Sequence, residues 1–379
     1  MTDAGTPIIL YGRLYTKYQF AISEVDTFAV PRNGAVYSQG NEVIVPASGE
    51  TAEDIARASA VEKSGVLLGG DLNILRPFDF INPLFLALAI SNGEPQKELA
   101  KKAQGKSVVH IHNTDIQEVT IAYPSRTEQD RIVSVFRQLD NLITLHQRKY
   151  DKLTNVKKSM LEKMFPKNGS NVPEIRFKGF TEAWEQRKLT EFVEFFSGLT
   201  YTPNDVQENG TLVLRSSNVS NGEVVDADNI YVNPQVVNSE NVKVGDIVVV
   251  VRNGSRSLIG KHAQIKAFMP NTVIGAFMTG IRSECPEFTN ALLNTSRFEE
   301  EIAMNMGATI NQITGYMFSK MEFKVPCLDE QKKIGEYFEK LDNLITLHQC
   351  EFQIVSKRRK ARLRRRAFEF TVIFALIVL

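Results

Sequence analysis

Features that commonly reveal a protein's chemistry are scarce in this sequence. It has three cysteines in 379 residues. None of them forms a C-x-x-C pair, so no zinc or redox motif is expected, and the odd count fits a reducing cytoplasm. The N-terminus lacks the basic and apolar regions of a secretory signal. The apolar residues 371–379 are too few for a membrane-spanning helix, which needs roughly 20. We therefore expect a cytoplasmic protein without a membrane partner.

An excess of charge of one sign is missing as well. The chain has 45 basic and 44 acidic residues, a formal charge of +1. Residues 357–366 hold eight basic and no acidic residues, and the rest of the chain has a net charge of −7. A protein that coats nucleic acid by bulk charge is excluded, whereas a locally basic surface is not. The basic stretch by itself is equally typical of a solvated helix end.

Sequence motifs of catalysis are also missing. There is no G-x-x-x-x-G-K-[ST] loop and no G-x-G-x-x-G after a strand, so no nucleotide-hydrolysing site is predicted. Asn82-Pro-Leu-Phe85 is similar to the N-P-P-[FY] motif of amino-methyltransferases, but Leu84 replaces the second proline. We interpret it as the start of a helix. His110 and His112 have no acidic or thiol partner nearby, which favours a surface or base-contacting role over a metal site. We predict no catalytic residue and no metal site.

An internal repeat organises the chain. The nine residues 139–147, LDNLITLHQ, recur unchanged as 341–349, an offset of 202. Pro124 matches Pro326 at the same offset, and Glu128-Gln129 match Glu330-Gln331. A period this long indicates two domains and not a solenoid.

The repeated segment predicts two long helices with a heptad seam. Its apolar positions are spaced four and three residues apart, which is typical of a coiled coil. The seam residues are Ile132, Phe136, Leu139, Ile143 and His146, then Ile334, Phe338, Leu341, Ile345 and His348. We expect spacer helices over residues 126–165 and 326–366. The first would be roughly 58 Å long at 1.5 Å per residue, more than one turn of DNA at about 34–36 Å.

Two seam features allow more than one interpretation. His146 and His348 occupy matched positions, where a metal pair or a proton switch is conceivable, but we favour side chains that pack in the seam. Further along, Arg359, Arg362 and Arg366 fall on the second seam. Charged residues there predict that coiled-coil packing stops after Val355.

The regions outside the helices predict α+β domains. Residues 166–325 contain strand-like runs at 212–214, 246–252, 263–267, 272–274 and 321–325, and helical stretches at 289–297 and 298–306. Residues 1–125 look like a shortened copy: 8–10 can be aligned with 212–214, 69–76 with 275–282, and Ser48-Gly49 with Asn253-Gly254. Residues 367–379 form an atypical apolar tail. Diverged domains on identical helices suggest one scaffold with two recognition surfaces.

Polar side chains gather where the predicted strands end. Arginine, lysine, asparagine, glutamine and serine on such loops are the residue types that contact base edges and phosphates. Taken singly, each is typical of a polar loop tip; their grouping beside a duplicated scaffold favours DNA binding. The candidate DNA-binding residues of the second domain are Arg215, Ser216, Asn218, Arg252, Asn253, Ser255, Arg256, Lys261, His262, Asn311 and Gln312, and those of the first are Tyr11, Arg13, Tyr15, Lys106, His110 and His112.

These motifs carry a family resemblance. Pro-x-x-x-Glu-Gln-x-x-Ile followed by Phe-x-x-Leu-Asp-x-Leu-Ile-x-Leu-His-Gln occurs twice, and the stretch 173–189 around Trp184 lies between the copies. Together they resemble the conserved regions of the specificity subunit of type I restriction-modification enzymes, over roughly residues 6–355.

The resemblance implies a fold and a set of partners. Two target-recognition domains would be held apart by two long antiparallel coiled-coil helices with pseudo-twofold symmetry. Each domain would read one half of a split sequence in double-stranded DNA. The subunit would be non-catalytic and would bind no cofactor. It would dock two methyltransferase subunits and the restriction/translocase subunits, which would bind S-adenosylmethionine, ATP and Mg²⁺.

The sequence departs from the family at both ends. Only nine residues precede Leu10, whereas nearly forty residues lie between Arg176 and Leu214 in the second domain. This predicts a truncated first domain, and a frame-shifted or recombined gene would explain both ends. Two alternatives therefore stay open: a coiled-coil scaffold that binds proteins and not DNA, and a non-functional truncated cassette. The bases read and the length of the gap do not follow from the sequence.

Overall fold

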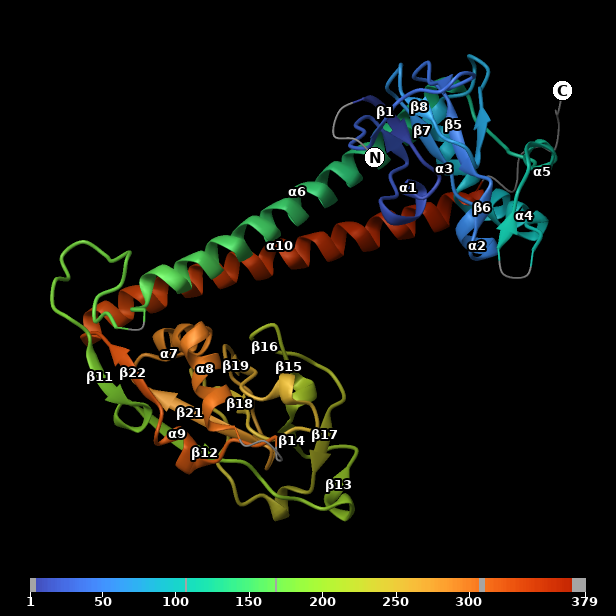
Figure 1. The fold of residues 1–379 in the computed structure, drawn as a ribbon. Helices are drawn as coiled ribbons and strands as arrows, with labels where there is room; N and C mark the ends of the chain where they lie inside the picture. Colours follow the sequence, from blue (N-terminus) through green and yellow to red (C-terminus); the bar gives the residue numbers. More distant parts are fainter. Residues whose placement is uncertain (1–4, 106–107, 168, 307–310, 370–379) are drawn as a thin grey trace. The chain divides into compact units, whose positions relative to one another are not determined.

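The computed structural model describes residues 5–105, 108–167, 169–306 and 311–369. Figure 1 traces the chain through mixed strands and helices, with the two long helices α6 (Arg126–Met164) and α10 (Leu328–Glu369). The chain forms two compact units, residues 1–147 with 349–379 and residues 148–348. Each unit therefore contains one globular region together with part of α6 and part of α10. No helix within the described ranges is long and apolar enough to cross a membrane.

The first unit contains two small four-stranded sheets. Their strand orders are β3-β1-β8-β4 and β2-β7-β5-β9, and a further pair joins β10 to β6. The strands are β1 (Thr6–Ile9), β2 (Ala21–Ile22), β3 (Phe28–Ala29), β4 (Val36–Tyr37), β5 (Val43–Pro46), β6 (Ser48–Gly49), β7 (Ser59–Val61), β8 (Leu67–Leu68), β9 (Leu72–Leu75) and β10 (Val109–His110), and the short helices are α1 (Arg13–Thr16), α2 (Ala52–Ile55), α3 (Pro83–Ile90), α4 (Gly93–Lys102) and α5 (Asn113–Gln117).

The motif at Asn82 is a helix start, as the sequence indicated. The Asn82 side chain accepts hydrogen bonds from the backbone N–H groups of Leu84 (2.9 Å) and Phe85 (3.3 Å), and Pro83 occupies the first turn of α3. Asparagine at the N-cap followed by proline is a favourable combination because it satisfies free N–H groups at a point where proline loses none. The helix-start interpretation of the motif is confirmed.

The second unit repeats this plan with more strands. It has four-stranded sheets in the orders β12-β21-β18-β19 and β13-β17-β14-β20, and the pairs β11-β22 and β15-β16. The strands are β11 (Glu185–Lys188), β12 (Val193–Ser197), β13 (Val206–Gln207), β14 (Thr211–Leu214), β15 (Val219–Ser220), β16 (Glu223–Val224), β17 (Ile230–Val232), β18 (Ile247–Val250), β19 (His262–Gln264), β20 (Thr272–Ile274), β21 (Met278–Ser283) and β22 (Glu322–Val325), and the helices are α7 (Pro286–Leu293), α8 (Ser296–Asn305) and α9 (Gly315–Phe318), with five short 3-10 turns.

The two helical stretches predicted at 289–297 and 298–306 correspond to helices α7 and α8, with different bounds. The predicted boundary between residues 297 and 298 is wrong, because the chain breaks earlier, at Asn294 and Thr295. The Thr295 hydroxyl accepts a hydrogen bond from the Phe298 N–H and so caps α8. Threonine competes for backbone hydrogen bonds inside helices and is favoured at caps, which explains the position of the break.

Aromatic side chains form the centre of the second unit. The Phe165 ring lies 5.8 Å from Trp184, 5.7 Å from Phe288 and 6.1 Å from Phe338, measured between ring centroids. These contacts join the end of α6, the segment before β11, α7 and α10. Beside them, Arg176 donates two hydrogen bonds of 2.7 Å to the carboxylate of Glu330, whose side chain is almost fully buried. The first turn of α10 is thus anchored by a buried ion pair.

The heptad seam is confirmed in both helices. Every predicted seam residue is buried or half-buried, whereas Leu142 and Leu145 between them are exposed. Lys157 Nζ lies 2.6 Å from the Asp342 carboxylate in the second unit. At the repeat offset of 202, its counterpart is the pair of Arg359 with Asp140 in the first unit.

The predicted loss of packing after Val355 is wrong. Helix α10 continues to Glu369, and Leu363 packs against the first unit's core. Arg359 is tolerated on the seam because Asp140 supplies its countercharge, and a guanidinium binds a carboxylate well through two N–H groups. Arg362 is exposed.

The shortening of the first domain has a structural counterpart. The second unit carries β11 along β22 and β12 along β21. The described residues of the first unit contain no equivalent of either strand, and residues 119–125, which match the β22 segment, form no strand. Nearby, Phe78 stacks on Phe80 and Phe80 packs on Tyr123, and all three rings are about half exposed or more. Residues 370–379 lie outside the described residues.

Candidate nucleic-acid interface

Three strands of the second unit end at neighbouring loops, and the first two of these loops carry predicted DNA-binding residues. Strand β14 runs into Arg215 and Ser216, β18 into the loop 251–258, and β20 into the turn before Phe277. Arg252 lies opposite Gln312 in an isolated antiparallel bridge. The fold thus brings residues 216, 252–254 and 311–312, which are up to about a hundred positions apart, into one loop cluster.

Asparagine side chains hold this cluster in place. The Asn253 amide donates to the Ser216 hydroxyl (3.0 Å), and its oxygen accepts from the Ser255 N–H (2.9 Å). The Asn311 amide donates to the Gly254 carbonyl (3.0 Å). Asn253, Ser216 and Asn311 therefore position the loop as well as presenting polar groups at its surface.

The arginines and lysine of this region are free to bind an anion. Arg252 is exposed, and its guanidinium lies 5.0 Å from the centroid of the Phe277 ring, which is 56% exposed. Arg256 and Lys261 are exposed and line one cleft. Among the described residues, no carboxylate forms an ion pair with Arg252, Arg256 or Lys261. Uncompensated cations beside polar loop groups are suited to phosphates and base edges.

Three predicted DNA-binding residues of the second unit are bound by other parts of the same unit. His262 is buried, with Nδ1 3.0 Å from the Gly260 carbonyl and its ring edge-on to Phe298, and burial lowers its pKa so that it packs as a neutral side chain. Asn218 is 1% exposed and ties its loop to the carbonyl of Ala227. Arg215 forms an ion pair with Asp228 at 2.7 Å. The sequence could not reveal the contacts with Phe298, Ala227 and Asp228, because these residues are brought close only by the fold.

Among the predicted DNA-binding residues of the first unit, some are likewise bound within the unit and others are exposed. The Arg13 guanidinium donates hydrogen bonds to Asp26 (2.8 Å) and Gln19 (3.0 Å) and is therefore already paired, and its role as a DNA contact stays a prediction. Tyr15 is half-buried and donates to the Ser48 carbonyl (2.7 Å); burial raises its pKa to about 12, so it remains a neutral donor. Tyr11 and His110 are exposed.

His112 and Lys106 are the remaining two predicted DNA-binding residues of the first unit. His112 is exposed, and its backbone N–H and ring flank Asp115 at the start of α5, which makes it part of a helix start. Lys106 lies outside the described residues.

Two exposed aromatic residues of the second unit were not among the DNA-binding residues predicted from the sequence. Phe277 lies under Arg252, and Tyr316, 68% exposed, lies under Lys320 at 4.3 Å. Aromatic faces hold cations by their quadrupole and also stack on bases. No sequence signal separates an exposed phenylalanine from a core one, so only the fold identifies them.

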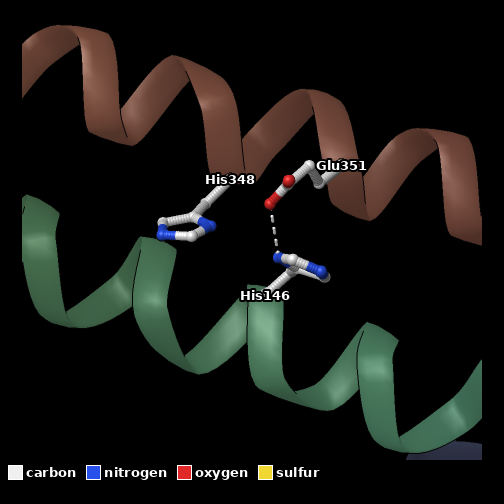
Figure 2. A group of neighbouring side chains, drawn as sticks. All are labelled: His146, His348 and Glu351. Atoms are coloured by element: carbon white, nitrogen blue, oxygen red, sulfur yellow. Dashed lines mark ion pairs between the residues drawn. The ribbon is translucent and has the colours of Figure 1, made fainter.

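The seam histidines are not a purely apolar contact. Figure 2 shows His146 of α6 with Glu351 of α10, and the His146 Nδ1 lies 2.9 Å from a Glu351 carboxylate oxygen. His348 lies one turn before Glu351 on α10. Both histidines are half-buried. The expected packing role is therefore supplemented by an ion pair within the seam whenever His146 is protonated.

The fold defines a class of protein: a mixed domain of helices and strands built twice, each copy attached to long paired helices with a repeated seam. The model of the type I restriction modification DNA specificity domain matches residues 6–155 and 181–354. This chain belongs to that family. Its members are non-catalytic subunits of type I restriction systems, and catalysis lies on other subunits.

Curated relatives and a solved structure agree with this assignment. The chain is 24% identical to the type I restriction enzyme MjaVIII specificity subunit of Methanocaldococcus jannaschii, over 86% of this chain and 78% of that one. It is 28% identical to the EcoKI specificity subunit of Escherichia coli over 43% of this chain and 36% of the relative. The crystal structure of the S subunit from M. genitalium has a similar fold, with a TM-score of 0.57, 16% identity, and coverage of 96% and 88% of the two chains.

Proposed function

We propose that this chain recognises a split sequence in double-stranded DNA, with each globular domain reading one half. The observation that carries the proposal is the repetition of one domain plan with different polar side chains on its loops. The second unit adds three exposed cations without an ion pair among the described residues: Arg252 over the exposed Phe277 ring, and Arg256 with Lys261 in one cleft. A duplicated scaffold with different loops suits a reader of two different half-sites.

The repeat also supports docking of two identical partners. Leu142 and Leu145 are 42% and 45% exposed, and their counterparts Leu344 and Leu347 are 43% and 50% exposed. Seam packing does not require leucine at exposed positions, yet the same pair occurs in both copies. We propose that each pair docks one methyltransferase subunit.

Other parts of the proposal rest on the family alone. Restriction/translocase subunits would join the same complex. S-adenosylmethionine, ATP and Mg²⁺ would bind to the partner subunits and not to this chain. The cytoplasmic location stays a prediction.

Replacing Arg252 and Arg256 with alanine is expected to weaken DNA binding by the assembled complex. Loss of one base contact and one phosphate contact corresponds to roughly 10- to 100-fold in Kd. Fluorescence anisotropy with DNA carrying the target measures the change. Alanine at Arg187 and Lys188, two exposed residues of β11, serves as the matched control. Equal affinity of the Arg252/Arg256 variant and the control would favour a protein-binding scaffold that does not contact DNA.

A further inference from the structure

Each unit contains one short antiparallel pairing between two backbone segments at its loops, and we refer to this pairing as the crossing. In the first unit, β6 and β10 pair antiparallel, with His110 opposite Ser48. In the second unit, Gln312 lies opposite Arg252 in the isolated bridge. His110 and Gln312 are separated by 202 residues, the offset of the helical repeat. The two crossings therefore occupy corresponding places in the two domains.

Backbone hydrogen bonds establish this correspondence independently. The Ile111 N–H donates to the Ala47 carbonyl at 3.0 Å, and the Ile313 N–H donates to the Val251 carbonyl at 2.9 Å. Both isoleucines are 1% exposed. The core residue beneath the crossing is thus the same in both units, and Ser48 corresponds to Arg252.

The side chains above this shared backbone differ in chemistry. In the second unit, Arg252 is exposed and held over Phe277, and Gln312 is half-buried. Arginine pairs through two hydrogen bonds with guanine, and glutamine does so with adenine. In the first unit, Ser48 is 8% exposed and its hydroxyl lies 3.1 Å from the His110 Nδ1, so that the exposed imidazole presents the accessible polar group.

Both crossings are fixed by their surroundings. Asn253 and Asn311 hold the loop in the second unit, as described above. In the first unit, Tyr15 donates to the Ser48 carbonyl, and the Asn73 amide donates to the Ile111 carbonyl at 2.9 Å. Asn73 is buried. A side chain that reads bases needs such a rigid support, because a loose position gives little discrimination.

We infer that this crossing carries a pair of specificity-determining residues in each domain: Arg252 with Gln312 in the second and Ser48 with His110 in the first. The difference between the pairs makes the two halves of the target different. The inference rests on the proposed function and adds to it the residues that distinguish one half-site from the other.

The test exchanges the residues of one crossing for those of the other. The full chain with Arg252→Ser and Gln312→His is produced with its methyltransferase subunits, and the methylated motif is determined by long-read sequencing. The half-site read by the second domain should change or become degenerate at one or two base pairs, with discrimination there falling about 10- to 100-fold. The other half-site should stay unchanged. Ser48→Arg with His110→Gln should affect only the other half.

Controls separate this inference from the proposed function. Gln186→His with Arg187→Ser makes chemically similar changes on β11 and should leave the motif intact. If the exchange at 252 and 312 leaves both half-sites unchanged, the inference is overturned and the proposed function stands. If the wild-type complex methylates no motif, both fail. If the exchanged variant loses all methylation, Arg252→Lys decides: degeneracy at one base pair supports the inference, and an unchanged motif overturns it.

Discussion

Complexes that carry Leu344→Glu and Leu347→Glu are expected to contain one methyltransferase subunit where the wild-type chain binds two. A glutamate at a docking surface leaves a carboxylate without a partner when the surface is covered, which costs about 3 kcal/mol or more. That corresponds to a loss of more than roughly 100-fold in affinity. Adding Leu142→Glu and Leu145→Glu should remove the second subunit and abolish methylation. Native mass spectrometry of the co-expressed subunits counts the copies.

The chain provides its own control for this experiment. Asn141 and Asn343 are exposed repeat counterparts next to the leucines. Asn141→Glu and Asn343→Glu introduce one carboxylate per helix beside the same sites, half the charge of the fourfold leucine variant, without removing apolar surface, and should leave the complex intact. Because the leucines are exposed in the chain alone, its own fold should stay stable. A complete complex formed by the fourfold leucine variant would contradict docking at these sites.

Glu330→Gln is expected to destabilise the second unit by about 3–5 kcal/mol in free energy of unfolding. The Glu330 side chain is 1% exposed, and its two oxygens accept both hydrogen bonds from Arg176, which is 12% exposed. The substitution leaves the guanidinium buried without a countercharge. Guanidinium chloride titration followed by Trp184 fluorescence measures the effect, because Trp184 is the sole tryptophan and lies in this unit's core.

The repeat supplies the comparison for Glu330 as well. Glu128 is its counterpart at the offset of 202 and is exposed. Glu128→Gln should change the unfolding free energy by less than about 0.5 kcal/mol. Replacing Arg176 and Glu330 together with methionine should recover most of the stability, since no charge remains buried. If Glu330→Gln unfolds at the same denaturant concentration as wild type, the ion pair does not anchor α10.

The helices and the domain plan could be predicted because their signals are local. A heptad seam requires an apolar residue every three or four positions, and nine identical residues at an offset of 202 reveal the duplication directly. The tolerance of Arg359 could not be predicted in this way. Its countercharge, Asp140, lies 219 positions away and is brought close only by the pairing of α6 with α10.

The alignment of the loops and short strands between the two domains could not be predicted from the sequence. The proposed alignment of Ser48-Gly49 with Asn253-Gly254 is wrong by one residue, since the pairing of Ser48 with His110 and of Arg252 with Gln312 matches Ser48 to Arg252. The first strand is shifted by one as well: Ile9 pairs with Leu68 as Leu214 pairs with Ile274. Short diverged strands have no pattern that fixes their register, and His262, Arg215 and Arg13 could not be distinguished from surface residues without their partners.

On the proposed function, this chain directs DNA modification to a split sequence. The most direct measurement is the methylome of cells that express the chain together with matching methyltransferase subunits, compared with cells that express those subunits alone. We expect adenine methylation at one asymmetric, two-part motif that appears only when the chain is present. Assembly of a complete complex without any such motif would contradict it.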